Sequence, residues 1–287
     1  MKIAITSASG QLGSAIAKQL VTEIGKDSVI AIARTPEKAK HLGVEVRKGD
    51  YNDREEFDKA LIGVDKVLLV SGMDDPKKRI QQHRNVIEAA QQNGVQKIVY
   101  TSIVGDEEST AFSPVVQSNR QTEQDVSESG LQWVIGRNGI YIEPDLEYLD
   151  HYVKEGEIRN CAGDGKCGYT SREELAYAYS QMLLKDKHNG QTYNLVGAPI
   201  TQAELADLIN QVFGTNLKFN HVAVAEYEEE RKAELGDFIG TVIAGIYDGI
   251  KKGVNDVPSD FERAVGRSHK SPLEMIENFK NHGKSSS

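Results

Sequence analysis

The chain has 287 residues, of which 39% are hydrophobic and 27% are charged, a composition typical of globular rather than fibrous or disordered proteins. Its net charge of −9 has the wrong sign for a protein that binds nucleic acids through their phosphates. No apolar run approaches the about 18 residues needed to cross a bilayer, and the first residues lack the apolar segment of an export signal. The two cysteines and seven histidines lack the spacings of a disulfide framework or a metal site. We therefore expect a cytoplasmic protein without a metal, a nucleic-acid partner or a membrane segment.

The first half of the chain alternates between short apolar runs and segments with helical spacing. Residues 3–6 form an apolar run that ends in a Ser/Gly turn, after which Leu12, Ile16 and Leu20 recur at helical spacing. Further strands are predicted at 28–33, 44–47, 66–71, 97–102 and 132–137, with helices at 36–42, 54–61, 83–93 and 119–129. Strands that alternate with helices predict an α/β protein with a doubly wound parallel sheet, as in the Rossmann fold.

Beyond residue 138 this alternation weakens. Ser171 with Glu174, and Thr201 with Glu204, place a hydroxyl and a carboxylate three residues apart, which is typical of helix starts. Helices are predicted at 147–154, 172–184, 202–213 and 226–235, a last helix from 271, short strands at 192–196 and 217–221, and a frayed tail at 284–287. We expect a nucleotide-binding domain at 1–140, to which strands return from the second half, and a smaller, helix-rich substrate-binding part at 141–287.

The segment TSASGQLG at 6–13 lies between the first predicted strand and the first predicted helix. A diphosphate at such a point needs a tight turn, a close approach of the backbone and amide donors at a helix N-terminus. Gly10 and Gly13 meet that need, although Ser7 stands where the motif usually has its first glycine. The alternative is a plain strand-to-helix turn. The cofactor ligands predicted in this segment are Thr6, Ser7, Ser9, Gly10, Gln11, Leu12 and Gly13.

The end of the second predicted strand bears on the choice of dinucleotide. A carboxylate there accepts from the ribose 2′-hydroxyl of NAD, whereas a 2′-phosphate needs an arginine. This chain has Arg34 at that point, and Lys38 follows one turn later. The pattern favours NADPH, and the alternative is a solvated surface arginine.

Seven segments together resemble the NmrA-like branch of the atypical short-chain dehydrogenases, and within it the type 2 NAD(P)H:quinone oxidoreductases and the triphenylmethane reductases. The similarity runs from residue 2 to about residue 280 and includes a helix around 246–248. The segments that carry it are 6–13, 32–34, GDY at 49–51, QHRNV at 82–86, YTS at 100–102, RNGIY at 137–141 and AGDGK at 162–166.

This resemblance implies a single Rossmann unit that binds NADPH over the carboxyl ends of its strands, with the substrate between that unit and the C-terminal part. By motif, residues 7–12 are the diphosphate loop and Arg34 is the ligand of the 2′-phosphate. The turn on the ribose side is Ser71, Gly72 and Met73, and the residues beside the nicotinamide are Asn138, Gly139 and Tyr141.

Short-chain dehydrogenases normally donate a proton from a Tyr-x-x-x-Lys pair after the fifth strand. This chain has no tyrosine at 113–123, and Asn119 stands where many NmrA-like proteins carry a lysine. Its one Tyr-x-x-x-Lys pattern begins at Tyr247, far downstream, and we interpret it as accidental. Loss of the acid argues against ordinary ketone chemistry. It does not argue against hydride transfer to a quinone or a cationic dye, since such an acceptor stabilises the incoming charge itself.

Three polar residues near strand ends are the candidates for catalysis: Asn138, Tyr141 and Ser102. The alternatives are that Asn138 caps a turn, Tyr141 fills the core and Ser102 satisfies the backbone. We predict a metal- and flavin-independent, NADPH-dependent oxidoreductase whose partner is a quinone-like small molecule, and we leave a homodimer open. The rival hypothesis is a redox-sensing regulator of the NmrA type that binds NAD(P) without turnover.

Overall fold

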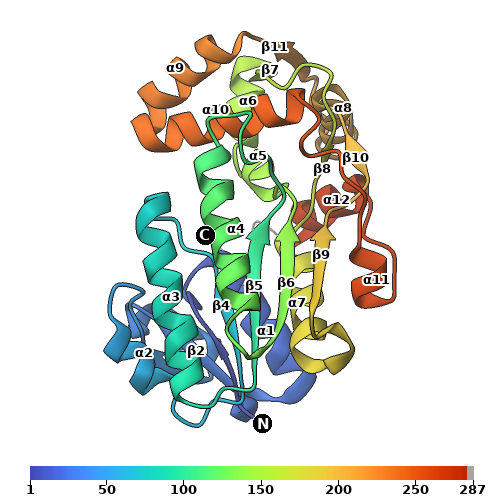
Figure 1. Ribbon diagram of the computed structural model, residues 1–287. Helices are drawn as coiled ribbons and strands as arrows, with labels where there is room; N and C mark the ends of the chain where they lie inside the picture. The colour runs from blue at the N-terminus through green and yellow to red at the C-terminus, as the bar shows by residue number, and fades with distance from the viewer. Residues whose placement is uncertain (283–287) are drawn as a thin grey trace.

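The computed structural model describes residues 1–282, and a seven-stranded parallel sheet forms its centre (Figure 1). The strands are β1 (Ile3–Ile5), β2 (Val29–Ala33), β3 (Glu45–Lys48), β4 (Lys66–Val70), β5 (Lys97–Ile103), β6 (Gln132–Asn138) and β9 (Gln191–Leu195). Their order is β3-β2-β1-β4-β5-β6-β9, and each neighbouring pair is parallel. The order reverses beside β1, which confirms the predicted doubly wound fold. The seventh strand, β9, comes from the second half of the chain.

Helices cover both faces of this sheet because side chains alternate along each strand. In β1, Ile3 and Ile5 belong to the core on one face, whereas Ala4 belongs to the core on the other. The first face packs against α1 (Gln11–Ile24), the 3-10 segment η2 (Pro36–Leu42), α7 (Arg172–Leu184) and α11 (Phe261–Val265). The second face packs against α2 (Arg54–Ala60), α3 (Pro76–Gln92) and α4 (Ser113–Ser127). The predicted Rossmann-like architecture is therefore confirmed.

The C-terminal part has a hydrophobic core of its own and lies over the edge to which the strands point (Figure 1). Two short two-stranded sheets, β7 with β11 and β8 with β10, brace its helices. Its elements are α5 (Glu143–Glu147), α6 (Leu149–Glu155), β7 (Glu157–Asn160), β8 (Cys167–Gly168), β10 (Pro199–Ile200), α8 (Gln202–Phe213), β11 (Lys218–His221), α9 (Val224–Leu235), α10 (Asp237–Lys251) and α12 (Pro272–His282). Short 3-10 turns also occur at η1 (Lys26–Ser28) and η3 (Asp186–His188). The carboxyl ends of the strands thus face a second layer of chain.

Several predicted element bounds were wrong. Helix α3 begins at Pro76 rather than at residue 83, because Asp75 caps the amide of Lys77 and Pro76 occupies the first turn. Helix α4 begins at Ser113 rather than at residue 119. The helix predicted at 147–154 corresponds to α6, which begins at Leu149, and the short helix α5 that precedes it was not predicted. The first turn of α3 holds a proline and three basic residues, so no apolar spacing marks its start.

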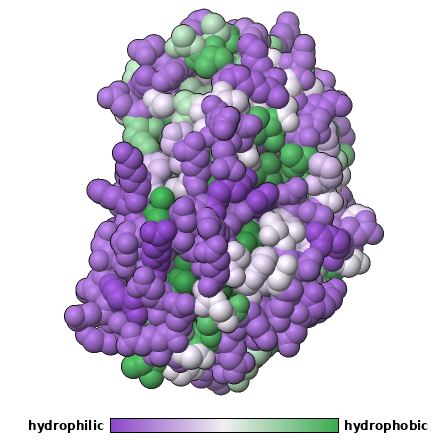
Figure 2. Space-filling view, viewed as in Figure 1, coloured by the Kyte–Doolittle hydropathy of each residue, from purple (hydrophilic) through white to green (hydrophobic). Residues whose placement is uncertain are grey.

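The surface is mostly hydrophilic in the view of Figure 2, and its broader apolar areas lie in the upper half, over the C-terminal part. The large apolar side chains that are most exposed there include those around the α9–α10 link, Leu235, Phe238 and Ile239. Within residues 1–282 there is no helix long and apolar enough to span a membrane. The tail predicted at 284–287 lies outside the described residues.

Candidate functional site

The loop between β1 and α1 makes the tight turn that a diphosphate needs. Ser7 has a φ of 49°, the one positive φ of a non-glycine residue among residues 1–282. Its carbonyl accepts from the amide of Gly10 at 2.9 Å. A Cβ on Gly13 would lie 2.5 Å from the same Ser7 oxygen, so only glycine lets the helix start this close to the loop. Ser7 therefore adopts the backbone conformation of the glycine that it replaces.

A buried phenol that the sequence analysis did not assign to the site supports this loop. The hydroxyl of Tyr51 donates to the carbonyl of Val70 at 2.5 Å. It also lies 2.6 Å from the Thr6 hydroxyl and accepts from the Ser7 hydroxyl at 3.2 Å. Burial raises the pKa of Tyr51 to about 12, so the phenol stays neutral. Thr6 is itself fully buried, and its hydroxyl also accepts from the amide of Val70, so its side chain holds the loop to β4.

Two cations without partners follow the end of β2. The side chains of Arg34 and Lys38 are exposed and make no hydrogen bond or ion pair with residues 1–282. By contrast, Lys40 in the same segment lies 3.5 Å from the carboxylate of Glu37. Strand β2 ends without a carboxylate, in the sequence Ala33-Arg34. An anionic group at this end of the sheet would meet positive charge that no protein group neutralises.

The turn after β4 is held by a buried histidine. The amide of Gly72 donates to Nε2 of His83 at 3.1 Å, and Nδ1 of His83 lies 2.9 Å from the Thr122 hydroxyl. Because Nε2 accepts, the ring proton is on Nδ1, which donates to Thr122. Burial lowers the pKa of His83 to about 3, which keeps the ring neutral. Next to this fixed turn, Met73 is 80% exposed, so its side chain is open to a ligand.

A chain of hydrogen bonds fixes the amide of Asn138 at the end of β6. The hydroxyl of Tyr179 in α7 donates to Oδ1 of Asn138 at 2.6 Å, and Nδ2 of Asn138 donates to the Tyr141 hydroxyl at 3.0 Å. A Cβ on Gly136 would lie 2.4 Å from the Tyr179 hydroxyl, so that glycine makes room for the phenol. Burial raises the pKa of Tyr141 to about 12. Asn138 thus bridges two tyrosines and does not cap a turn.

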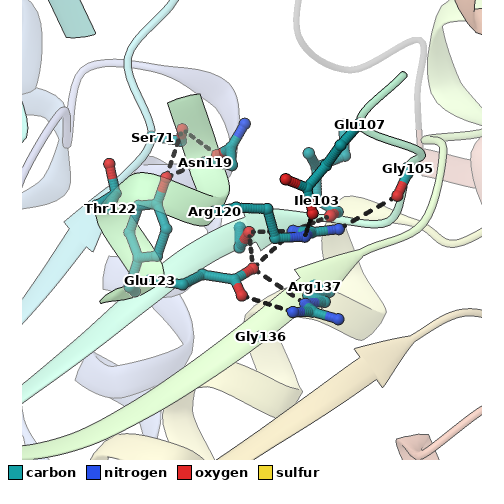
Figure 3. Close-up of polar contacts among 12 residues, drawn as sticks. Ser71, Ile103, Gly105, Glu107, Asn119, Arg120, Thr122, Glu123, Gly136 and Arg137 are labelled. Atoms are coloured by element: carbon teal, nitrogen blue, oxygen red, sulfur yellow. Dashed lines mark hydrogen bonds and ion pairs between the residues drawn. The ribbon is translucent and has the colours of Figure 1, made fainter. Parts of the chain in front are cut away.

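Ser102, the third candidate, is bonded to an ion-pair network of Arg120, Glu123 and Arg137, which Figure 3 labels. Its hydroxyl donates to the carboxylate of Glu123 at 2.5 Å. The same carboxylate receives Nη1 of Arg120 at 2.7 Å and Nη2 of Arg137 at 2.6 Å. The partner of Ser102 is therefore a side-chain carboxylate and not the backbone. The network joins α4 to the ends of β5 and β6.

Asn119 lies beside this network, and its carbonyl oxygen faces Ser71 (Figure 3). That oxygen accepts from the hydroxyl of Tyr100 at 2.6 Å and from that of Ser71 at 3.1 Å. Burial raises the pKa of Tyr100 to about 12, so it is not an acidified phenol. Tyr247 lies elsewhere, in α10, where its hydroxyl donates to Asp145 at 3.1 Å.

Comparison with known proteins identifies the family. The family model described as NAD(P)H-binding matches residues 7–186. Quinone oxidoreductase 2 of Escherichia coli is 32% identical over 256 residues, which is 88% of each chain. The chain belongs to the NAD(P)H-binding, NmrA-like family. The predicted resemblance is therefore confirmed.

Solved structures of the family agree over nearly the whole chain. The NADPH complex of the E. coli quinone oxidoreductase QOR2 has a TM-score of 0.89 at 30% identity and covers 97% of this chain and 100% of its own. The NADP(H) complex of the Citrobacter sp. triphenylmethane reductase has a TM-score of 0.87 at 33% identity and covers 98% and 99%. The cofactor of this family member is NAD(P)H, as predicted.

The geometry of this family member fits such a cofactor. Gly13 lets the start of α1 pack against the loop, as a diphosphate-binding turn requires, and Arg34 is free for a 2′-phosphate. Three supporting residues were missed from the sequence: Tyr51, His83 and Tyr179. Tyr51 and His83 fall within segments that carried the resemblance, so that signal was present. Tyr179 gave no signal of its own, because its link to the site depends on the space at Gly136.

Proposed function

We propose that this protein transfers a hydride from NADPH to quinone-like or related conjugated acceptors without a metal or a flavin. In this proposal residues 7–13 hold the diphosphate and Arg34 pairs with the 2′-phosphate. Asn138 and Tyr141 orient the nicotinamide and the acceptor between residues 1–140 and the C-terminal part. The relatives named quinone oxidoreductase and triphenylmethane reductase support this assignment.

One observation carries the choice of acceptor: the phenols near the strand ends are not acidified. The pKa values of Tyr141 and Tyr100 are each raised by burial to about 12, and the neighbour of Tyr100 at the usual lysine position is the neutral amide of Asn119. A simple ketone needs a proton donor as the hydride arrives. A quinone spreads the incoming charge over its ring, so correct positioning supplies most of the rate.

Asn138 would contribute through its fixed orientation. Tyr179 holds Oδ1, so Nδ2 faces Tyr141. Misplacing reacting atoms by about 1 Å can cost on the order of a hundredfold in rate. The second candidate function, a dinucleotide-binding regulator, is favoured by the same lack of an acid.

The deciding measurement is NADPH oxidation, followed at the nicotinamide absorbance, with a panel of benzoquinones, naphthoquinones and triphenylmethane dyes. We expect turnover with at least one conjugated acceptor and none with simple ketones. Tight NADPH binding without oxidation across the panel would instead establish the regulator. A reaction with simple ketones would contradict the proposed absence of an acid.

A further inference from the structure

One buried cation beside the candidate site has no anionic partner. Arg79 lies in the first turn of α3 and is only 3% exposed, yet no carboxylate among residues 1–282 lies within 4.0 Å of it. The two acids before the helix point elsewhere: Asp75 caps the amide of Lys77, and Asp74 accepts from the side chain of Gln82. The counter-charge of Arg79 is therefore not supplied by these neighbours.

Other partly buried arginines of this protein have carboxylate partners. Arg120 and Arg137 share the carboxylate of Glu123, and Arg172 pairs with Glu147 at 2.7 Å. Burying an unpaired charge is unfavourable, and a cation in the first turn of a helix also opposes the helix dipole. Desolvation correspondingly lowers the pKa of Arg79. The buried guanidinium of Arg79 therefore lacks the anionic partner that these other arginines have.

The guanidinium is also incompletely hydrogen-bonded. Its Nη2 donates to the Ser71 hydroxyl at 2.5 Å and to the Asn119 carbonyl at 3.3 Å. Its Nε is buried and has no partner within the described residues. Buried polar groups in folded proteins nearly always find partners, so an open donor on a buried charge needs an explanation.

The surroundings of Arg79 indicate what the charge faces. Ser71, drawn with Asn119 in Figure 3, begins the turn after β4, at the same sheet edge as the loop that starts with Ser7. The phenol of Tyr51 lies near enough to feel the charge of Arg79, and that phenol is hydrogen-bonded to Ser7. Arg79 thus lies next to the turn that we assign to the ribose and near the loop that we assign to the diphosphate.

We propose that Arg79 is a permanent positive charge whose counter-ion is the bound dinucleotide. Without the dinucleotide, the buried charge of Arg79 is unfavourable for the folded state. When the dinucleotide binds, its anionic diphosphate compensates that charge, with Ser71 between Arg79 and the ribose side of the cofactor. This inference rests on the proposed positions of the diphosphate at residues 7–13 and of the ribose at Ser71, and it does not depend on turnover. It differs from the role of Arg34, which acts on the 2′-phosphate alone.

The test compares stability and binding in the same variants. The wild type, Arg79→Met, Arg79→Gln and Arg79→Lys are purified free of nucleotide, and Tm and the Kd values for NADPH and NADH are measured by calorimetry. Arg84→Met is the matched control, because Arg84 lies on the same helix and is paired with Asp125 at 2.7 Å.

The two neutral variants at position 79 should keep or raise the Tm of the free protein and weaken NADPH by about tenfold or more. NADH should weaken by the same factor, because Arg79 does not act on the 2′-phosphate. Arg79→Lys should stay within about threefold of the wild type because the charge is kept. Arg84→Met should leave both Kd values unchanged.

A structural arginine would behave in the opposite way. If Arg79→Met and Arg79→Gln lower the Tm of the free protein by several degrees or fail to fold, or if NADPH binding stays within twofold, the proposal is overturned. A loss confined to NADPH would assign Arg79 to the 2′-phosphate and overturn it as well. If the wild type binds NADPH but reduces no acceptor, the proposed function fails and this inference still stands.

Discussion

Two buried ionisable side chains in this protein, Arg79 and Asp145, have opposite kinds of surroundings. Within residues 1–282, Arg79 near the dinucleotide loop has an unpaired donor and no anionic partner, whereas Asp145 in the C-terminal part has no cationic partner but accepts several hydrogen bonds. The carboxylate of Asp145 accepts from the hydroxyls of Tyr152 at 2.8 Å, Tyr247 at 3.1 Å and Tyr169 at 3.2 Å. The hydrogen bonds around Asp145 thus form a closed cluster within the protein. The region around Arg79, which we call the cofactor edge, keeps polar groups without protein partners.

The physical difference concerns where each charge finds its compensation. The side chain of Gln202 extends the Asp145 cluster by donating to Tyr169 at 2.9 Å, so α5, α6, α8 and α10 are joined around one carboxylate. At the cofactor edge, Arg34, Lys38 and the Nε of Arg79 find no partner within residues 1–282. Variants at the edge should therefore change binding, and variants in the cluster should change stability.

The largest expected effect is at the edge. Gly13→Val places a side chain against the Ser7 carbonyl, which a Cβ alone would approach to 2.5 Å. We expect NADPH affinity to fall by roughly a hundredfold or more, because the helix start is pushed from the loop. The measurement is a calorimetric titration of the folded variant.

Two neighbouring variants serve as controls for that result. A Cβ at Gly10 would lie 3.3 Å from the Ser7 carbonyl, so Gly10→Ala should be much milder. Ser7→Gly restores the residue that a φ of 49° favours and should bind NADPH normally. Normal binding by a folded Gly13→Val protein would place the diphosphate elsewhere.

The closed cluster offers the converse test. Asp145→Ala leaves three buried hydroxyls without an acceptor, so the free energy of unfolding should fall by about 3 kcal/mol. Urea unfolding measures this loss, and NADPH affinity should stay within twofold. A large loss of NADPH affinity with normal stability would contradict the expectation that the Asp145 cluster serves stability and not cofactor binding.

The same carboxylate predicts a pH dependence. Burial raises the pKa of Asp145 above its ordinary value, so the folded state binds a proton at this carboxylate more readily than the unfolded state does. The resulting stabilisation is complete below the ordinary carboxyl pKa of about 4 and is lost as the pH rises through the folded value. The difference in unfolding free energy between wild type and Asp145→Asn should therefore decrease as the pH rises. A difference that is constant with pH would contradict this prediction.

Arg34 tests whether its unpartnered charge at the edge is functional. If its guanidinium pairs with the 2′-phosphate, NADPH should bind about tenfold to a hundredfold more tightly than NADH. Arg34→Ala should remove most of that preference. Lys40→Ala, at the cation already paired with Glu37, should not. Equal affinities of the unmodified protein for both cofactors would refute the assignment.

Tyr179 connects the core to the edge. Tyr179→Phe removes the donor that orients Asn138, so kcat should fall about tenfold while the Kd for NADPH changes little. Tyr193→Phe is the matched control, because its buried hydroxyl lies 2.9 Å from His188 and away from Asn138. If both variants lose the same stability and neither loses rate, Tyr179 is only a core residue.

The smallest effect is expected at Tyr247. Its hydroxyl is one of three donors to Asp145, so Tyr247→Phe should lower the free energy of unfolding by about 1 kcal/mol. The rate of quinone reduction should stay close to normal. A large loss of rate would move the active centre into the C-terminal part and end the contrast between the two regions.

Local patterns were enough to predict much of the fold. Helices α7 and α8 have the predicted bounds, because a capping residue starts each and apolar spacing continues it. Helices α3 and α4 begin earlier than predicted, and the first turn of α3 is charged, so it shows no apolar spacing. The dinucleotide loop was found because its glycines lie between a strand and a helix. Because Ser7 stands where that motif usually has a glycine, a non-glycine residue adopts a positive φ there.

The sequence by itself determined the alternation of strands and helices, the loop at 6–13 and the position of an arginine after β2, because each depends on residues close together in the chain. Only the tertiary structure decided which distant residues complete the site. Tyr51 reaches Ser7, Tyr179 reaches Asn138 through the space at Gly136, and Arg79 is buried against Ser71 without an anion. These contacts arise when separate strands end at one edge and helices pack over them, and no local pattern records which side chains then meet.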